Sequence, residues 1–315
     1  MTRVACIGEC MIELRPAQGN QGAGLYSRGF GGDTLNTAVY LARLGVKTDY
    51  ITALGDDTLS DEMIAGWQAE GVGTSRVARL KGKLPGIYMI ETDAKGERKF
   101  FHWRESAAAR QLMDLPDTGD ILASLDSYEV IYLSAITLSI LGEAGRTGLI
   151  AALRQAMAQG ARIAFDTNFR ARGWPDLDVA RKVFRDAFEA ADIVLASTED
   201  LLPLYPGESN DSLLARIPGK EVVLKLAEPK SVVRIDGATH EITADPVTKP
   251  VVDTTAAGDS FAAAYIAARL GGADPVESAR AGHHLAGTVV CYPGAIIPRA
   301  AMPASGTSGP HKANP

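Results

Sequence analysis

Short apolar runs and longer amphipathic stretches follow one another along the first 70 residues of the chain. Residues 3–7 and 48–54 are short, mostly apolar runs of the kind that form buried strands. From Asp33 onward apolar side chains recur at helical spacing, and Gly45 then supplies a stop signal. A second helix is predicted over residues 60–70. This part of the chain therefore predicts strands that are joined by helices.

The alternation becomes regular from about residue 120. Strands and helices are predicted in turn over 130–133, 143–159, 162–165, 179–190 and 193–195, then from Glu199, over 221–225, and as a hairpin of 231–235 and 240–243. Such a pattern predicts an α/β fold whose central, mostly parallel sheet has helices on both faces. Ligands of these sheets bind beyond the carboxyl ends of the strands. Those positions are predicted to carry Asp166, Ser197, Lys225 and Asp259.

A hairpin interrupts this pattern. Its arms, 84–91 and 98–104, carry aromatic residues and flank a Gly-containing turn at 93–96. An isolated hairpin is only marginally stable, so we expect it to pair with the alternating run 11–14 and the Gly-rich loop that follows it. We therefore predict a small β-sheet lid, formed by about residues 11–31 and 84–104, beside the main sheet.

Length and charge narrow the classes of function. The 315 residues fit one large domain over 1–303, and residues 304–315, rich in Pro, Gly and Ser, predict a flexible tail. The formal net charge of −6 argues against nucleic-acid binding. No run is long enough to cross a membrane, and no signal peptide is predicted. These features predict a cytoplasmic protein.

The three cysteines are Cys6, Cys10 and Cys291. Cys6 and Cys10 are predicted on one strand, about 13 Å apart, which is too far for a disulfide. The spacing fits no zinc motif. Reduced cysteines agree with a cytoplasmic location.

The segment 251–261 carries the strongest chemical signal. Val251 and Val252 predict a short strand, small residues then form a turn, and a helix is predicted over 261–270. Backbone N–H groups at such a helix start form a phosphate site. Asp259 lies at its mouth. A carboxylate there costs energy, which is explained if it takes a proton from a hydroxyl that attacks phosphorus. The alternative is that Asp259 simply caps the helix.

A second polar cluster follows the Gly-rich run 29–32. Its glycines would let a ligand approach the backbone closely. Asp33 and Asn36 lie one helical turn apart and face the same way, so together they could hold sugar hydroxyls. The alternative for Asp33 is a helix N-cap.

Residues 253–259, Asp-Thr-Thr-Ala-Ala-Gly-Asp, resemble the DTxGAGD signature of the ribokinase-like (PfkB) carbohydrate kinases, with Ala256 where that family usually has Gly. A small conformational cost is expected at Ala256. The resemblance implies a ribokinase-like fold and a catalytic base at Asp259. It implies an anion hole at Ala256, Ala257 and Gly258. It also implies ATP and Mg²⁺ as cofactors, and a lid that covers the sugar and pairs with a second subunit.

The resemblance assigns further roles. It implies a substrate site made of Gly32, Asp33, Asn36, Tyr88, His102, Arg104, Asp166, Asn168 and Arg170. It implies nucleotide contacts at Ser197, Lys225, Gly258 and His284, a water-mediated magnesium contact at Asp200, and a monovalent cation, K⁺, at Asp253 and Thr255. The chain lacks the glycines that follow Lys225 in relatives, so a surface lysine is the alternative there. Ser197 has a helix N-cap as its alternative.

Two arginines suggest the chemical class of the substrate. Arg104 ends a predicted lid strand, and Arg170 follows a strand of the main sheet. Guanidinium groups bind a planar carboxylate better than a neutral sugar. The motifs are most similar to those of family members that phosphorylate the terminal hydroxyl of 2-keto-3-deoxygluconate to give 2-keto-3-deoxy-6-phosphogluconate. Two alternatives stay open: a kinase for a neutral ketose or nucleoside, and a sugar-binding regulator without catalysis. No GxGxxG follows the first strand, which argues against a dinucleotide-dependent oxidoreductase.

Overall fold

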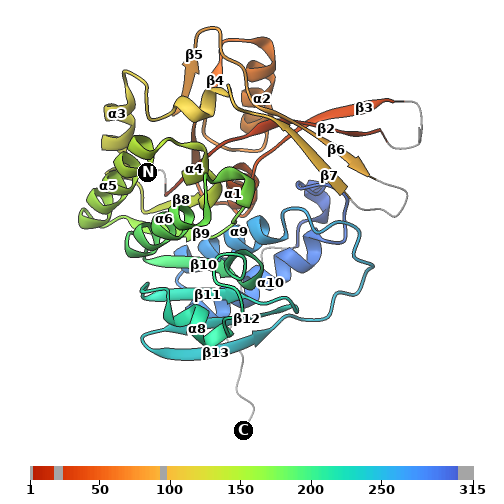
Figure 1. Ribbon diagram of the computed structural model, residues 1–315. Coiled ribbons are helices and arrows are strands. Elements are labelled where there is room, and N and C mark those ends of the chain that lie inside the picture. Colours follow the sequence, from red (N-terminus) through yellow and green to blue (C-terminus); the bar gives the residue numbers. More distant parts are fainter. Residues whose placement is uncertain (1–2, 18–23, 93–97, 304–315) are drawn as a thin grey trace.

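A nine-stranded sheet forms the centre of the computed structural model, which describes residues 3–17, 24–92 and 98–303 (Figure 1). Its strand order is β13-β12-β11-β10-β9-β8-β1-β4-β5. The strands are β1 (Val4–Ile7), β4 (Thr48–Gly55), β5 (Val77–Leu80), β8 (Val130–Ser134), β9 (Arg162–Asp166), β10 (Ile193–Ser197), β11 (Glu221–Lys225), β12 (Lys230–Ile235) and β13 (Ala238–Thr243). Neighbours from β5 to β11 are parallel, whereas β12 and β13 add an antiparallel edge. The predicted α/β class is confirmed.

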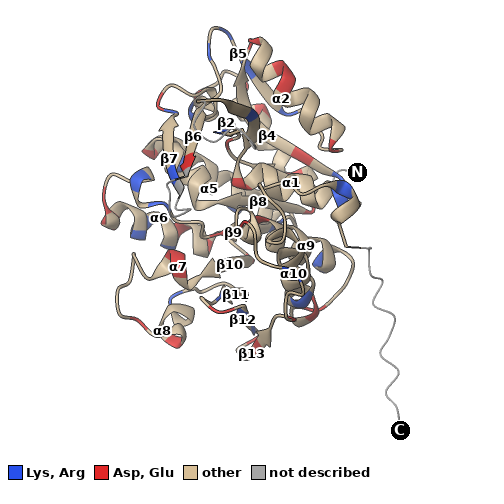
Figure 2. Cartoon of the chain, turned by 90° about the vertical axis from the view of Figure 1, so that its right-hand side faces the viewer, with Lys and Arg blue, Asp and Glu red and all other residues tan. Residues whose placement is uncertain are grey.

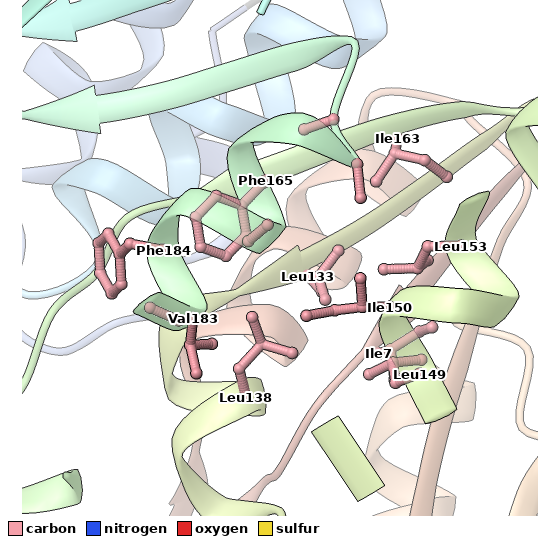
Figure 3. Close-up of a cluster of buried hydrophobic side chains, with 14 of the residues drawn as sticks. Ile7, Leu133, Leu138, Leu149, Ile150, Leu153, Ile163, Phe165, Val183 and Phe184 are labelled. Atoms are coloured by element: carbon pink, nitrogen blue, oxygen red, sulfur yellow. The ribbon is translucent and has the colours of Figure 1, made fainter. Parts of the chain in front are cut away.

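Helices cover both faces of this sheet. One face is covered by α1 (Asp33–Arg43), α2 (Thr58–Ala69), α9 (Ala257–Leu270) and α10 (Pro275–Val289). The other face is covered by α3 (Thr118–Ala123), α4 (Ala135–Ile140), α5 (Glu143–Ala158), α6 (Leu177–Glu189), α7 (Thr198–Leu201) and α8 (Asn210–Ala215). Successive strand residues serve opposite cores: Ile7 and Leu133 face the α5 side (Figure 3), and Cys6 and Tyr132 the α1 side.

Helix α6 shows how the sequence pattern produces this layer. Its buried residues Ala180, Val183, Phe184, Ala187 and Phe188 recur at helical spacing. Phe184 and Phe188 meet Phe165 of β9 edge to face, with ring centroids 5.9 Å apart in each pair. The charged residues of α6 lie on its outer side, where both signs occur (Figure 2). One amphipathic stripe thus attaches the helix to the sheet.

A separate four-stranded sheet projects from the main body (Figure 1). It contains β3 (Tyr26–Gly31), β2 (Met11–Pro16), β6 (Ile87–Thr92) and β7 (Arg98–Trp103), in that order. The expected hairpin of β6 and β7 and its pairing with residues 11–14 are confirmed. The predicted turn at 93–96, most of the Gly-rich loop at 19–24 and the tail at 304–315 lie outside the described residues.

The structure also differs from the sequence-based expectations. Residues 251–254 form no strand; the N–H groups of Val252 and Asp253 both donate to the carbonyl of Val290, a single acceptor that cannot form a ladder. Helices α3, α4 and α8 and strand β5 were not predicted. Cys10 does not share the strand of Cys6 but lies between β1 and β2, and all three thiols are free.

Within the described ranges, no helix is long and apolar enough to cross a lipid bilayer.

Candidate functional site

Asp259 lies in the first turn of α9, and α1 holds it there. The Nδ2 group of Asn36 donates to Asp259 Oδ2 over 2.8 Å, and the Thr37 hydroxyl donates to the Asp259 carbonyl over 3.2 Å. Both donors are buried residues of α1. The carboxylate therefore has a fixed direction, although 223 residues separate it from Asn36 along the chain. Its predicted position just after a strand is wrong, since the turn before α9 follows irregular backbone.

The turn before α9 carries the strain that the sequence suggested. Ala256 has φ 60° and ψ 16°, in the left-handed region, and its side chain offers no cap to the helix. A residue with a Cβ pays about 1–2 kcal/mol for this conformation. Of the three residues predicted to form an anion hole, Ala257 already donates its N–H to the Thr254 carbonyl over 3.2 Å. Gly258 lies in the same first turn of α9, at its positive end.

The surroundings of Asp259 favour its protonated form. Burial and the nearby Asp33 carboxylate raise the pKa of Asp259 to about 8, with Asp166 acting in the same direction. The hydrogen bond from Asn36 and the charge of Lys225 oppose this effect. A carboxylate whose pKa lies near neutrality can both accept and release a proton at physiological pH. This is the chemistry expected of a general base.

Lys225 belongs to the same site. It ends β11, and its Nζ lies 3.2 Å from Asp166 Oδ2 at the end of β9. A Cβ built on Gly258 would lie 3.6 Å from Nζ, so the ammonium group faces the start of α9. Burial disfavours its charge, but Asp166 and other carboxylates outweigh that effect and raise the pKa of Lys225. The alternative of a surface lysine is therefore wrong.

The expected cluster around Asp33 is present in a different form. The N-cap of α1 is Gly32, and Asp33 is the first helical residue, so the N-cap alternative for Asp33 is wrong. Its Oδ2 accepts a 2.7 Å hydrogen bond from Asn168 Nδ2. Gly32 is required because a Cβ there would lie 2.2 Å from the Glu9 carbonyl oxygen. The close approach at this glycine is thus made by the protein's own backbone.

Ser197 and Asp200 form a closed structural network. Ser197 is the N-cap of α7: its Oγ accepts from Asp200 N–H over 3.1 Å and donates to Asp200 Oδ2 over 2.7 Å. Buried Asp200 also accepts from Thr167 Oγ1 and from the Phe169 N–H, over 2.8 and 2.9 Å. The cap alternative for Ser197 is correct. Both carboxylate oxygens of Asp200 therefore accept hydrogen bonds that hold the segment after β9 in place.

Arg170 and Arg104 each contact a protein carboxylate. Arg170 lies in that same segment, donates to the Phe169 carbonyl and lies 3.4 Å from Asp200, with its side chain 62% exposed. Arg104 follows β7, is 20% exposed, and forms an ion pair with buried Glu9. Neither guanidinium group is fully enclosed, so both can meet a ligand.

Asp253 ties two loops together. Its Oδ1 accepts from the Thr255 N–H over 2.9 Å, and its Oδ2 accepts from the Gly294 N–H over 2.8 Å. Gly294 has φ 83°, a conformation that favours glycine. The carboxylate therefore supports the turn that leads into α9. The monovalent cation expected at Asp253 and Thr255 stays a prediction.

Tyr88 and His102 lie opposite each other on β6 and β7. Their rings stack with centroids 5.9 Å apart. The Tyr88 hydroxyl donates to buried Glu13 of β2, and His102 is exposed. Partial desolvation of the ring, followed by the positive charges of Arg104 and Arg172, lowers the pKa of His102. Both aromatic residues thus belong to the small sheet, with their hydrogen-bonding groups on one face.

Of the two histidines on α10, His283 and not His284 is turned toward the site. The His283 Nε2 lies 2.9 Å from the Ser231 hydroxyl, and its ring meets Phe261 edge-on at 5.1 Å. Burial and Lys225 lower the pKa of His283. His284 is exposed. Adjacent residues of a helix point to different sides, and the sequence alone did not reveal which side of α10 is covered.

Three residues of the site were missed as site residues at the level of sequence: Glu9, Glu13 and Thr37. The two glutamates interrupt an apolar, strand-like run, and that burial of charge was the available signal. No group of three or more His, Cys, Asp or Glu side chains that could hold a metal ion occurs among the described residues.

The raised pKa of Asp259 predicts that Asp259→Asn stabilises the protein increasingly as pH rises. The folded state keeps a proton up to about pH 8, whereas an unfolded aspartate releases it near pH ~4. Stability from this group is thus fully present below about pH 4, declines as the unfolded state loses its proton, and is lost once pH has risen through 8. We expect the variant to gain roughly 1 kcal/mol or more at pH 9, or about 2 °C in Tm, and much less at pH 5.

Thermal unfolding of the wild type and variant at pH 5, 7 and 9 checks this expectation. Asp178→Asn, at an exposed position on α6, serves as the control. A Tm difference that is the same at all three pH values would contradict it.

Comparison with known proteins finds one family over nearly the whole chain. A family model described as "pfkB family carbohydrate kinase" matches residues 1–302. A relative from Dickeya dadantii (strain 3937) and one from Escherichia coli (strain K12), both named 2-dehydro-3-deoxygluconokinase, are 47% and 41% identical over 311 residues. Those matches cover 96% of this chain and 98% and 99% of the relatives.

Solved structures share the fold. A fructokinase with bound ATP from Xylella fastidiosa has a TM-score of 0.81 at 24% identity, covering 96% of this chain and 95% of that chain. A 2-dehydro-3-deoxygluconokinase from Thermotoga maritima has a TM-score of 0.79 at 25% identity, covering 94% and 96%. The resemblance drawn from residues 253–259 is confirmed, and the chain belongs to the pfkB family of carbohydrate kinases.

Proposed function

We propose that this chain transfers the γ-phosphoryl group of ATP to the terminal hydroxyl of 2-keto-3-deoxygluconate, giving 2-keto-3-deoxy-6-phosphogluconate. Two relatives with 47% and 41% identity carry the name of this activity. The observation that carries the proposal is the Asp259 carboxylate, held in the first turn of α9 by Asn36 and with its pKa raised to about 8. A phosphate site with a base at its mouth is what a phosphoryl transfer to an alcohol requires.

Each protein group then has a defined task. Asp259 takes the proton of the attacking hydroxyl, and the N–H groups of Ala256 and Gly258, at the start of α9, stabilise the charge that develops on the phosphoryl oxygens. The N–H of Ala257 already donates to the Thr254 carbonyl, so of the three expected anion-hole residues it contributes least. Lys225 faces Gly258 and supplies a positive charge on the nucleotide side. The segment after β9 and the Asp33 cluster hold the sugar.

Magnesium would enter with the nucleotide. Asp33 and Asp166 both raise the pKa of Asp259, so negative charge accumulates where the phosphates would lie, and a divalent cation would offset it. Asp200 is engaged by Ser197, Thr167 and Phe169. We therefore assign the magnesium ion to the phosphates and water and not to Asp200. Asp166 is the carboxylate nearest to Lys225 on this side of the site. A K⁺ ion beside Asp253 and Thr255 is a further part of the proposal.

The substrate carboxylate is assigned to Arg104 and Arg170. Each guanidinium is only partly enclosed and offers several N–H donors. A neutral ketose or nucleoside would leave both charges without a ligand partner. The alternative of a regulator without catalysis is disfavoured because Asp259 and its supporting Asn36 are both present.

The small sheet is proposed to act as a lid and as a subunit contact. Tyr88 and His102 share one face of it, where they would cover the sugar. Large apolar side chains are exposed on β7, including Phe101 and Trp103, the latter 58% exposed. Exposed aromatic clusters of this kind mark interaction sites, and a second copy of this chain is the partner we propose.

Removal of the base predicts a loss of turnover. Asp259→Asn keeps the size and the hydrogen bond from Asn36 but cannot take a proton. We expect kcat to fall by about 10²–10⁴, while KM for the keto acid changes little. Steady-state rates of ADP formation with 2-keto-3-deoxygluconate measure this, and the Tm of the variant controls for folding. A variant with near wild-type turnover would rule out Asp259 as the base.

Removal of either arginine predicts a loss of acid selectivity. In Arg104→Ala and Arg170→Ala, KM for the keto acid should rise at least about tenfold, equivalent to roughly 1.4 kcal/mol. The KM for ATP should stay near wild type, and Arg→Lys should rescue only partly because the planar fork is lost. The readout is the preference for the acid over its carboxyl-reduced analogue. If the wild type has no such preference, the acid-sugar assignment fails and the neutral-sugar alternative is favoured.

The lid contact predicts a change of oligomeric state. Trp103→Glu should shift the protein toward monomers in sedimentation velocity, because it places a charge in an apolar contact. Leu202→Glu is the matched control, since Leu202 is 40% exposed on the main body, next to α7. Equal sedimentation of wild type and Trp103→Glu would refute the contact.

A further inference from the structure

Glu9 is a buried charged residue in the short connection between β1 and β2. It is 2% exposed, and one of its carboxylate oxygens contacts the Nη2 group of Arg104. Burial of a carboxylate is costly unless it is paired. The chain therefore has a buried Glu9–Arg104 ion pair at the edge of the proposed sugar site, where a purely apolar contact would have a lower desolvation cost.

The position of Glu9 is a junction between the two sheets. Main-chain segments pass between the main body and the small sheet at residues 8–10, Gly32, Gly86 and Arg104. The Glu9 carbonyl lies against Gly32, where a Cβ would come within 2.2 Å, and Oε1 would lie 3.2 Å from a Cβ on Gly86. Arg104 takes the other carboxylate oxygen. One residue thus contacts all of these connections.

The ion pair is incomplete, which distinguishes it from a closed structural bridge. Neither Oε1 of Glu9 nor Nε of Arg104, both buried, has a hydrogen-bond partner among the described residues. The Arg43–Glu70 pair, by contrast, is bidentate, with Nε–Oε2 and Nη2–Oε1 contacts of 2.8 and 2.9 Å. The Nε–H of Arg104 is enclosed, but the side chain as a whole is 20% exposed. The exposed part of a guanidinium at a site edge is available to a second carboxylate.

We propose that Glu9 is a positioning residue for substrate selection: it holds the Arg104 guanidinium at the junction of the two sheets, so that the exposed part of that group faces the carboxylate of the sugar acid. The inference rests on the proposed function, because it assigns Arg104 to that carboxylate. Glu9 itself touches no reacting atom. A buried anion behind the arginine fixes its direction, and Arg110 and Asp33 are the other charges that act on Glu9.

A double-mutant cycle tests this role with Glu9→Ala, Arg104→Ala and the double variant. Glu9→Ala should raise KM for the keto acid at least about tenfold, roughly 1.4 kcal/mol. Its kcat should stay within about threefold of wild type, since a positioning effect on binding leaves the chemical step intact. The preference for the acid over its carboxyl-reduced analogue should fall in parallel. In the Arg104→Ala background, Glu9→Ala should change KM by less than about twofold, because coupled residues are not additive.

Two further variants keep the test decisive. Glu9→Gln keeps an oxygen that can accept from Arg104, so its KM should lie between wild type and Glu9→Ala; it replaces Glu9→Ala in the cycle if the latter does not fold. Glu70→Ala removes the acid of the bidentate Arg43 pair and should lower Tm without changing the acid preference.

The outcomes separate cleanly. If Glu9→Ala raises KM by the same factor with and without Arg104, or behaves like Glu70→Ala, Glu9 is structural and the inference is wrong. If Arg104→Ala itself keeps the wild-type acid preference, the assignment of Arg104 to the substrate carboxylate fails, and the inference about Glu9 fails with it.

Discussion

The arrangement of the site depends on one hydrogen bond between two helices, from Asn36 of α1 to Asp259 of α9. A carboxylate in this position is unfavourable by itself, because burial and the Asp33 charge both oppose its ionised form. The packing of α1 against α9, with the additional contact of Thr37 to the Asp259 backbone, compensates for that cost. The helices that cover one face of the sheet therefore also fix the proposed base, Asp259.

The strand ends supply the second layer of the site, and their polar residues divide into two roles. Asp166 and Lys225, at the ends of β9 and β11, form a pair that faces the start of α9. Ser197 and Asp200, at the end of the intervening β10, hydrogen-bond to each other, and Asp200 also accepts from Thr167, so both support the local backbone. At the carboxyl ends of these three strands, polar residues that can meet a ligand thus lie on either side of polar residues that support the backbone.

The small sheet is attached through a narrow junction around Glu9, where bulk is excluded at Gly32 and Gly86. Its own interior holds a second buried acid, Glu13, which accepts from Tyr88. Buried acids paired with an arginine and a tyrosine therefore lie at the base and in the middle of the proposed lid. A lid supported by polar contacts has defined positions for its side chains, which suits the selection of a substrate by charge.

The sequence by itself determined the layers and pointed to Asp259 as the proposed base. Short apolar strands, amphipathic helices and the 253–259 motif depend on local spacing, and local spacing is visible without coordinates. Only the tertiary structure decided which polar residues share the site. The partners of Asp259 and Lys225 lie 223 and 59 residues away, and the choice of His283 over His284 depends on which helical face is covered. The backbone at 251–254, apolar enough for a strand, stays irregular because its N–H groups meet one carbonyl, that of Val290, and no neighbouring strand. Hydrogen-bond partners so distant in sequence are set by packing, and packing is a property of the whole chain.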